Sequence, residues 1–231
     1  MTKTIKTIIP ASMTTIRNKK GMTPYMSKGW DIETLTFNIL AVYDRADEDE
    51  RLSGAAWYPR AQAAAAAMVA ATSLPLVTCA GVLAALSPRN RWSRNVADAM
   101  AMAVAFVAGG TAAAMAVPVC TFNSNKMKAR DILTSAGGRD EVADILSGRK
   151  LRSFYGCILG DRGAEVCIDG HAVSIALGER IPLDSTPSLS AGRYASMQWA
   201  YNRAAAARGV SAATMQAVTW VSFRTTHGIK N

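Results

Sequence analysis

Apolar residues recur along this chain at the spacing of helix faces. After Asp31, whose carboxylate can cap a helix, Leu35, Ile39 and Val42 form one apolar stripe. This pattern predicts a first helix at residues 32–46. Alternating runs of Val, Ile, Thr and aromatic residues, which would indicate half-buried strands, are hard to find.

The same spacing, with Gly and Pro as breakers, predicts the rest of the chain. Further helices are expected at residues 60–72, 76–86, 93–107, 140–146, 150–159, 172–177, 191–207 and 211–225, and segment 122–133 becomes helical toward its end. Residues 47–50 are predicted to form an acidic loop and residues 178–190 a Pro-rich linker. The predicted fold class is therefore all-α, with about ten helices.

Composition and length refine this picture. Half of the 231 residues are apolar, and Ala occurs in runs at 63–67 and 204–207. Ala is the strongest helix former, and its small side chain allows close helix packing. The length suits two small lobes that share a core. We expect a basic, irregular arm at residues 1–28 and one two-lobed helical domain at residues 29–231, with a cleft between the lobes.

The longest apolar run, at residues 99–119, could nearly span a bilayer. It is dominated by Ala and contains Gly109, Gly110 and Pro118, so a buried core helix with a break is expected instead. The apolar stretch at residues 8–10 is too short for the core of a signal peptide. We therefore expect a cytoplasmic protein with no membrane partner.

The formal net charge of +9 is unevenly distributed. No acidic residue follows Asp184, while five Lys and Arg residues do. A positive field of this kind attracts polyanions, most often nucleic acid. The residues predicted to contact nucleic acid are Arg89, Arg91, Arg94, Lys126, Lys128, Arg149 and Arg152.

The cysteines and the absence of common motifs exclude several classes of protein. The four cysteines show no C-x-x-C spacing, and only two histidines are present. A metal site is therefore not expected, and no cofactor is predicted. No P-loop, G-x-G-x-x-G or G-x-S-x-G motif occurs, which argues against nucleotide triphosphate hydrolases, dehydrogenases and serine hydrolases.

Two residues are candidates for chemistry. Asp169 is predicted at a helix N-terminus, where the dipole keeps a carboxylate ionised. Beside a flipped nucleoside it could stabilise positive charge on the sugar or activate a nucleophile; the alternative is a cap with no chemistry. Lys150 could be a nucleophile or a phosphate contact. His171 could orient Asp169, contact phosphate or be structural.

The stretch Gly148-Arg149-Lys150, followed by a helix and then by residues 166–172, resembles the helix-hairpin-helix DNA glycosylase superfamily. Lys150 matches the lysine that forms a Schiff base in bifunctional members, and Asp169 matches the catalytic aspartate. The segment Asn125–Leu133 resembles the helix before the hairpin. The chain departs from the family at Ser147-Gly148, where glycosylases have a Gly-rich turn that binds a DNA phosphate.

A second set of residues is similar to a group of small phage-encoded proteins of this fold. The set is Ala84–Pro88, Trp92, Asn95, Thr121–Asn123, Lys150, Phe154–Tyr155, Ile168–His171 and Gln216–Trp220. Phage relatives include enzymes that attach amino acids or amines to an activated thymine derivative in DNA. The resemblance implies a phage protein acting in an infected bacterial host. The predicted substrate-binding residues are Trp92, Asn123, Asn125, His171 and Tyr155.

The expected function is therefore modification of a flipped, hypermodified pyrimidine in DNA, with Asp169 and Lys150 as the catalytic residues. The expected partners are duplex or single-stranded DNA and an amino acid or amine co-substrate, and the chain is expected to be a monomer. Two alternatives stay open. One is a DNA glycosylase or lyase that excises a base. The other is a non-catalytic module that binds DNA or inhibits a host enzyme.

Overall fold

The computed structural model describes residues 30–160 and 165–229, and within these ranges the chain forms helices and no strand. The α-helices are α1 (Ile32–Arg45), α2 (Glu48–Ala55), α3 (Trp57–Thr72), α4 (Leu76–Leu86), α5 (Trp92–Ala116), α6 (Asn123–Thr134), α7 (Arg139–Leu146), α8 (Arg149–Leu159), α9 (Gly170–Leu177), α10 (Ala191–Arg208) and α11 (Ala212–Thr226). A short 3-10 helix, η2 (Leu183–Ser185), lies in the Pro-rich linker. The predicted all-α fold is confirmed. The arm predicted at residues 1–28 lies outside the described residues.

Capping side chains set several helix starts. Asp31 Oδ1 accepts a hydrogen bond from the Thr34 amide at 2.9 Å and begins α1. Asp47 and Glu50 cap one another at 2.8 and 3.2 Å and begin α2. The loop predicted at residues 47–50 was therefore wrong, because acidic side chains in a first turn stabilise the helix dipole. α3 begins at Trp57, earlier than predicted, since Pro59 fits a first helical turn.

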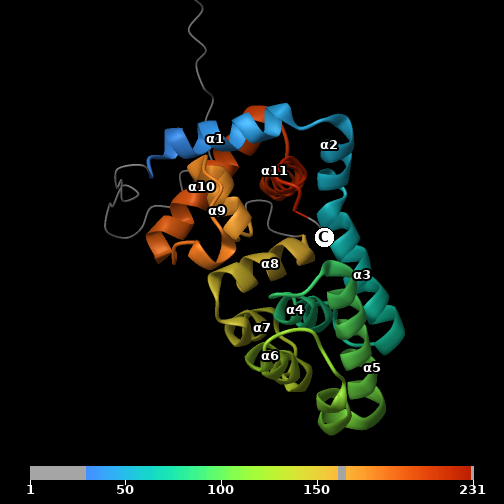
Figure 1. Cartoon of the computed structure of the whole chain (residues 1–231). Helices are drawn as coiled ribbons and strands as arrows, with labels where there is room; N and C mark the ends of the chain where they lie inside the picture. The colour runs from blue at the N-terminus through green and yellow to red at the C-terminus, as the bar shows by residue number, and fades with distance from the viewer. Residues whose placement is uncertain (1–29, 161–164, 230–231) are drawn as a thin grey trace, which may run out of the picture.

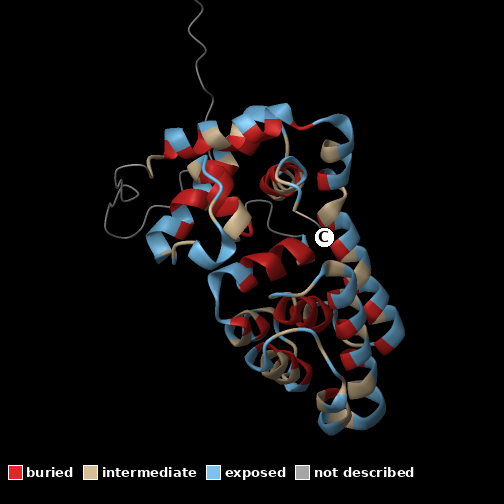
Figure 2. Ribbon diagram, viewed as in Figure 1, coloured by how far each residue is buried: buried red, intermediate tan, exposed pale blue. Residues whose placement is uncertain are grey.

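The helices divide into two lobes, each with its own hydrophobic cluster (Figure 1). The first lobe contains α3 to α8, with α4 buried at its centre. The second contains α1, α9, α10 and α11. The chain starts in the second lobe, crosses to the first through α2 and α3, and returns after α8. Figure 2 shows buried residues concentrated on α4, on α8 and on the inner face of α11.

Helix α5 is the longest helix of the described chain and is rich in apolar residues. By length and composition alone it is the one described helix that could cross a membrane. The backbone leaves helical geometry at Gly109 and Gly110 and then continues as helix to Ala116, so the predicted break is a kink. Only 22% of its most apolar window is buried. The buried core helix predicted here is therefore buried on one face, which includes Met102 and Ala103.

Helices α7 and α8 are joined by Ser147 and Gly148 into a helical hairpin. Ser147 has a φ of +58°, a conformation that side chains rarely adopt. The Lys128 ammonium, from α6, donates to the Leu146 carbonyl at 2.8 Å and to Ser147 Oγ at 2.9 Å. A cation at this position stabilises the C-terminal end of α7. The hairpin fixes where α8, and with it Lys150, begins.

Candidate functional site

The carboxylate of Asp169 lies half-buried at the N-terminus of α9. Its Oδ1 accepts a hydrogen bond from the Ala172 amide at 2.8 Å, so the predicted helix cap is confirmed. Its Oδ2 accepts from the indole Nε1 of Trp220, on α11, at 3.1 Å. Two donors from two helices therefore fix both oxygens. A carboxylate oxygen can accept two hydrogen bonds, and one is described for each oxygen of Asp169, so each has capacity for a second.

Lys150 lies in the first turn of α8, whose backbone contacts the segment that precedes Asp169. The Cys167 thiol donates to the Lys150 carbonyl at 3.6 Å, which places the start of α8 against the segment that leads into Asp169. Burial raises the pKa of the Cys167 thiol well above its ordinary value; the Lys150 ammonium opposes this rise and the Asp169 carboxylate adds to it. Both charges also act on the imidazole of His171. The two predicted catalytic residues therefore share one electrostatic neighbourhood.

His171 lies on the first turn of α9, beside α11. Its ring is 6.2 Å from the Trp220 ring and 5.8 Å from the Phe223 ring. Burial lowers the pKa of His171 below 6.5; Asp169 raises it, and Arg224, Lys150 and His227 lower it further. The imidazole is therefore largely neutral at pH 7, which suits it to exchange a proton rather than to carry a fixed charge.

An aromatic cluster fills the junction of the two lobes next to Asp169. The Trp57 ring lies 5.1 Å from Trp92, 5.7 Å from Phe154 and 6.3 Å from Trp220. These four rings come from α3, α5, α8 and α11. The three tryptophans are half-buried, so part of each ring meets solvent. Partly exposed aromatic rings beside a carboxylate are suited to stacking a nucleobase.

Sequence reasoning placed Trp92 in this site and raised Trp57, with Tyr58, as a possible lining of a base pocket or as core. Phe154 and Trp220 were part of the resemblance to phage proteins but were given no role in the site. Trp220 is 51 residues from Asp169 in the chain, and no local pattern connects the two. Arg224, one helical turn after Trp220, was missed. Its guanidinium carbon lies 4.2 Å from the centre of the Trp220 ring. The rings of α3, α5 and α8 belong to the first lobe, and they meet Trp220 of α11 only when both lobes are assembled.

Not every predicted substrate-binding residue joins the cluster. Tyr155 is 2% exposed and lies in the core of the first lobe, where burial raises its pKa to about 12. Its predicted position in the site was wrong; the preceding Phe154 occupies that position because it lies on a different face of α8. Asn125 is buried and donates to Thr121 Oγ1 at 3.3 Å. Asn123 is exposed at the start of α6, and no contact places it beside Asp169.

Several of the predicted nucleic-acid-binding cations have partners within the protein. Arg94 pairs with Asp98, Arg152 with Asp144, and Lys126 donates to two main-chain carbonyls at the end of α5 at 2.6 Å. These side chains, like Lys128 in the hairpin, support the fold. Their sequence positions alone showed their charge but not these partners.

The cations closest to open solvent are Arg89, Arg91 and Arg149. Arg89 contacts Asp184 of η2 at 3.4 Å through an exposed ion pair. The same segment closes on the site, because a Cβ at Gly170 would meet Leu183 and Thr186 within 3 Å. Arg89 therefore lies on the rim of the site, at the side where η2 packs on α9.

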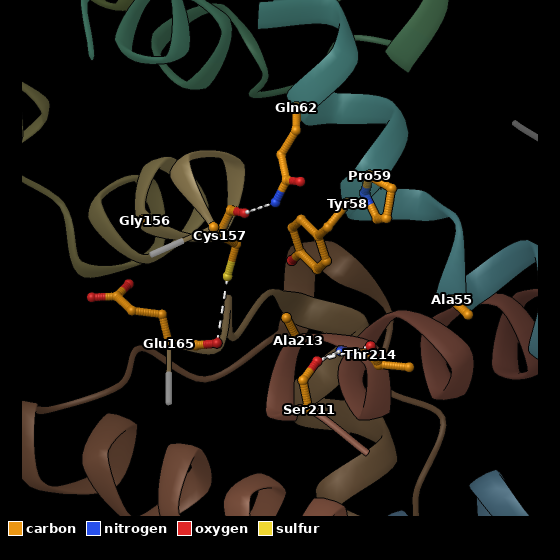
Figure 3. A pocket seen from close by; sticks show the side chains of 11 residues that line it. Ala55, Tyr58, Pro59, Gln62, Gly156, Cys157, Glu165, Ser211, Ala213 and Thr214 are labelled. Carbon is orange, nitrogen blue, oxygen red and sulfur yellow. Dashed lines mark hydrogen bonds between the residues drawn. The ribbon is translucent and has the colours of Figure 1, made fainter. Parts of the chain in front are cut away.

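Two cavities accompany the junction, and neither is lined by Asp169 or Lys150. The first, of about 200 Å³, lies between α3, α8 and the start of α11 and includes Tyr58, Gln62 and Cys157 (Figure 3). The second, of about 300 Å³, is an open groove between α8 and α10, lined by Arg149, Arg152, Ser153, Glu165, Ala191, Tyr194, Ala195 and Gln198. The groove begins one residue away from Lys150.

The cysteines occupy separate positions in the fold. Cys79, Cys157 and Cys167 are buried and Cys120 is exposed, and all four are free thiols. Burial raises the pKa of the Cys157 thiol to about 12. Within the described ranges, no three His, Cys, Asp or Glu side chains lie together in a way that could hold a metal ion.

Comparison with known proteins identifies a family but no function. The model of a family of unknown function (DUF7178) matches residues 22–227, which is most of the chain, and the chain therefore belongs to this family. No curated protein and no solved structure matches the chain significantly.

Proposed function

We propose that this member of a family of unknown function is an enzyme that modifies a pyrimidine base extruded from DNA. The observation that carries the proposal is the arrangement around Asp169. A carboxylate fixed at a helix N-terminus accepts a hydrogen bond from Trp220, one of four aromatic rings at the junction of the two lobes. The charges of this carboxylate and of Lys150 both act on the largely neutral imidazole of His171. The resemblance of residues 148–172 to helix-hairpin-helix glycosylases supports the same assignment.

The aromatic cluster suits the binding step. A base in a duplex is inaccessible, so enzymes that act on a base extrude it and stack it between aromatic side chains. Trp57, Trp92 and Trp220 offer half-exposed rings at the junction. Arg89 and Arg91, on the loop before α5, carry positive charge at its rim and can contact the flanking phosphates.

Asp169 and Lys150 suit the chemical step. Asp169 can stabilise a cation that develops on the sugar or on an activated group at position 5 of the base. Lys150 is an exposed residue, and its charge acts on the same imidazole as that of Asp169. In the modification reaction, the amine nitrogen forms a C–N bond to the carbon attached at position 5 as the C–O bond to the phosphate group breaks. The phosphate leaves with the bonding electron pair, stabilised by the Lys150 ammonium, and the proton lost from the amine passes to solvent.

Base excision is the second candidate, and the position of Lys150 favours it. An amine beside the catalytic carboxylate could attack the sugar carbon as the base leaves. The hairpin favours modification instead. It has one glycine, Gly148, and its Leu146 carbonyl and Ser147 hydroxyl are occupied by Lys128. A turn of this kind exposes fewer backbone N–H groups to a duplex phosphate than a Gly-rich turn.

The co-substrate in this proposal is an amino acid or another amine. The groove between α8 and α10 has Arg149 and Arg152 on its wall, and Arg152 also pairs with Asp144. Guanidinium groups recognise carboxylates, so this groove is the place where we expect the carboxylate of an amino acid to bind.

Mass spectrometry of nucleosides tests the proposal. DNA that carries 5-hydroxymethyluracil, or its phosphorylated form, is incubated with the protein and a mixture of amino acids and amines. A heavier nucleoside produced by the wild type and lost in Asp169→Asn supports modification. A released base or an abasic site supports excision.

Asp31→Asn is the matched control. Asp31 caps α1 through the Thr34 amide as Asp169 caps α9 through Ala172, but among the described hydrogen bonds only the Asp169 carboxylate accepts one from an indole. Asn is itself a good helix cap, so both variants should fold. If neither wild type nor variants change the DNA while all bind it tightly at low salt, the enzyme proposal is refuted in favour of a binding module.

A further inference from the structure

We infer that Trp220 is a positioning residue for Asp169, whose indole N–H orients the carboxylate for the reaction at the lobe junction. The inference rests on the proposed function for its catalytic consequence. The geometric part does not, since it concerns a hydrogen bond of 3.1 Å between Trp220 Nε1 and Asp169 Oδ2 in the chain itself.

The helix cap alone leaves one carboxylate oxygen unconstrained. The Ala172 amide holds Oδ1 at 2.8 Å, and a single hydrogen bond allows the group to rotate about the bond to its Cβ. The indole holds Oδ2 from a different helix, so rotation would break one of the two bonds. A fixed carboxylate needs no reorientation when charge develops in a transition state.

The indole is itself held on two sides. The Arg224 guanidinium lies 4.2 Å from the Trp220 ring centre, and the Trp57 ring approaches at 6.3 Å with a 64° angle between the planes. Trp57 belongs to the first lobe and Trp220 to the second. Both hydrogen bonds to the Asp169 carboxylate come from the second lobe. Its orientation nevertheless depends on the first lobe too, because Trp57 packs against Trp220.

The imidazole of His171 gives a readout that needs no substrate. Four groups face it: Asp169 raises its pKa, while Arg224, Lys150 and His227 lower it beyond the effect of burial. The chain has two histidines, so two imidazole signals appear in an NMR titration and a His227→Gln variant assigns them. The drop in His171 pKa caused by Asp169→Asn measures how close the carboxylate is held.

The experiment is a double-mutant cycle. It compares the change in His171 pKa caused by Asp169→Asn in the wild type with the change in the Trp220→Phe protein. In the wild-type background Asp169→Asn lowers the His171 pKa. In the Trp220→Phe background the carboxylate can turn away, and we expect the same substitution to lower the pKa less than half as far. Trp199→Phe, which changes a tryptophan on the outer face of α10, should leave the drop at its full size. An unchanged drop in Trp220→Phe refutes the inference.

Turnover of the DNA substrate separates positioning from packing. We expect Trp220→Phe to lower kcat about 10-fold and to change KM by less than about twofold, because one hydrogen bond to a charged group is lost. The double variant with Asp169→Asn should be no slower than Asp169→Asn alone. If the wild type turns over no DNA but the titration cycle gives the expected result, the proposed function fails and the positioning of Asp169 by Trp220 stands.

Discussion

Gly54 lies where α2 crosses α11, and Gly54→Ala should force these helices apart. A Cβ at this position would lie 2.5 Å from Val218 Cα and 2.7 Å from Val218 N. Both are backbone atoms that cannot rotate away, and carbon atoms pack at about 3.5–4.0 Å, so the helices must separate by about 1 Å. Overpacking of this kind costs about 2–3 kcal/mol, which for a chain of this size lowers Tm by about 4–12 °C.

Urea unfolding followed by circular dichroism measures this loss, and Gly192→Ala is its control. A Cβ at Gly192, on the exposed first turn of α10, would meet nothing within 4 Å. Ala there should stabilise the protein by about 0.5–1 kcal/mol, because Gly loses more backbone entropy in a helix. The two Gly→Ala changes should thus have opposite signs. A Gly54→Ala protein within about 0.5 kcal/mol of wild type would show that α2 and α11 do not approach as closely as described.

Three further predictions concern titration, the hairpin and the thiols. Burial keeps the pKa of His171 below its unfolded value of 6.5, so the unfolded chain binds the proton first, and stability should fall as pH drops from about 6.5 toward the folded pKa. Urea unfolding across this range should show a shallower fall in His171→Gln, and an identical slope would contradict the burial. Lys128→Met should lower the free energy of unfolding by about 1–3 kcal/mol, because the Leu146 carbonyl and Ser147 Oγ lose their donor; an unchanged urea midpoint would show that the ammonium adds nothing to the hairpin. In a thiol-reagent assay Cys120 should react in the folded protein and all four thiols after denaturation; rapid reaction of a second thiol would contradict the buried core.

Local patterns predicted the helices well because each signal is contained in one segment. The helix predicted at 76–86 coincides with α4, where Pro75 precedes it and every residue from Thr78 to Leu86 is buried. The largest error in the helices lies at residues 47–50. The acidic residues there were interpreted as an exposed loop, whereas they stabilise the N-terminal end of the α2 dipole. In α5 the Gly-Gly pair interrupts the helical backbone where the sequence predicts it, and a second helical segment then continues to Ala116.

The candidate site was predicted in part, for a related reason. The helix cap at Asp169 was predicted because a turn, a helix and a capping aspartate lie within one stretch of chain; the catalytic roles of Asp169 and Lys150 stay predictions. Tyr155 was wrongly placed. Adjacent residues of α8 point to different faces, so Tyr155 lies in the core of the first lobe while Phe154 lies at the junction. Lys126 carries the charge expected of a phosphate contact, but its partners, the carbonyls at the end of α5, depend on how α5 and α6 pack.

The architecture explains why a site at this junction depends on distant residues. Asp169 caps its own helix, α9, through one carboxylate oxygen. The indole that holds the second oxygen is on α11, and α11 packs closely against α2 at Gly54. The 1 Å separation expected in Gly54→Ala therefore acts two residues from Trp220, at Val218. That variant should weaken the hydrogen bond to Asp169 as well as the fold, and the drop in His171 pKa on Asp169→Asn should shrink with it. We therefore expect the close approach of α2 and α11 to set the geometry of the Asp169 carboxylate.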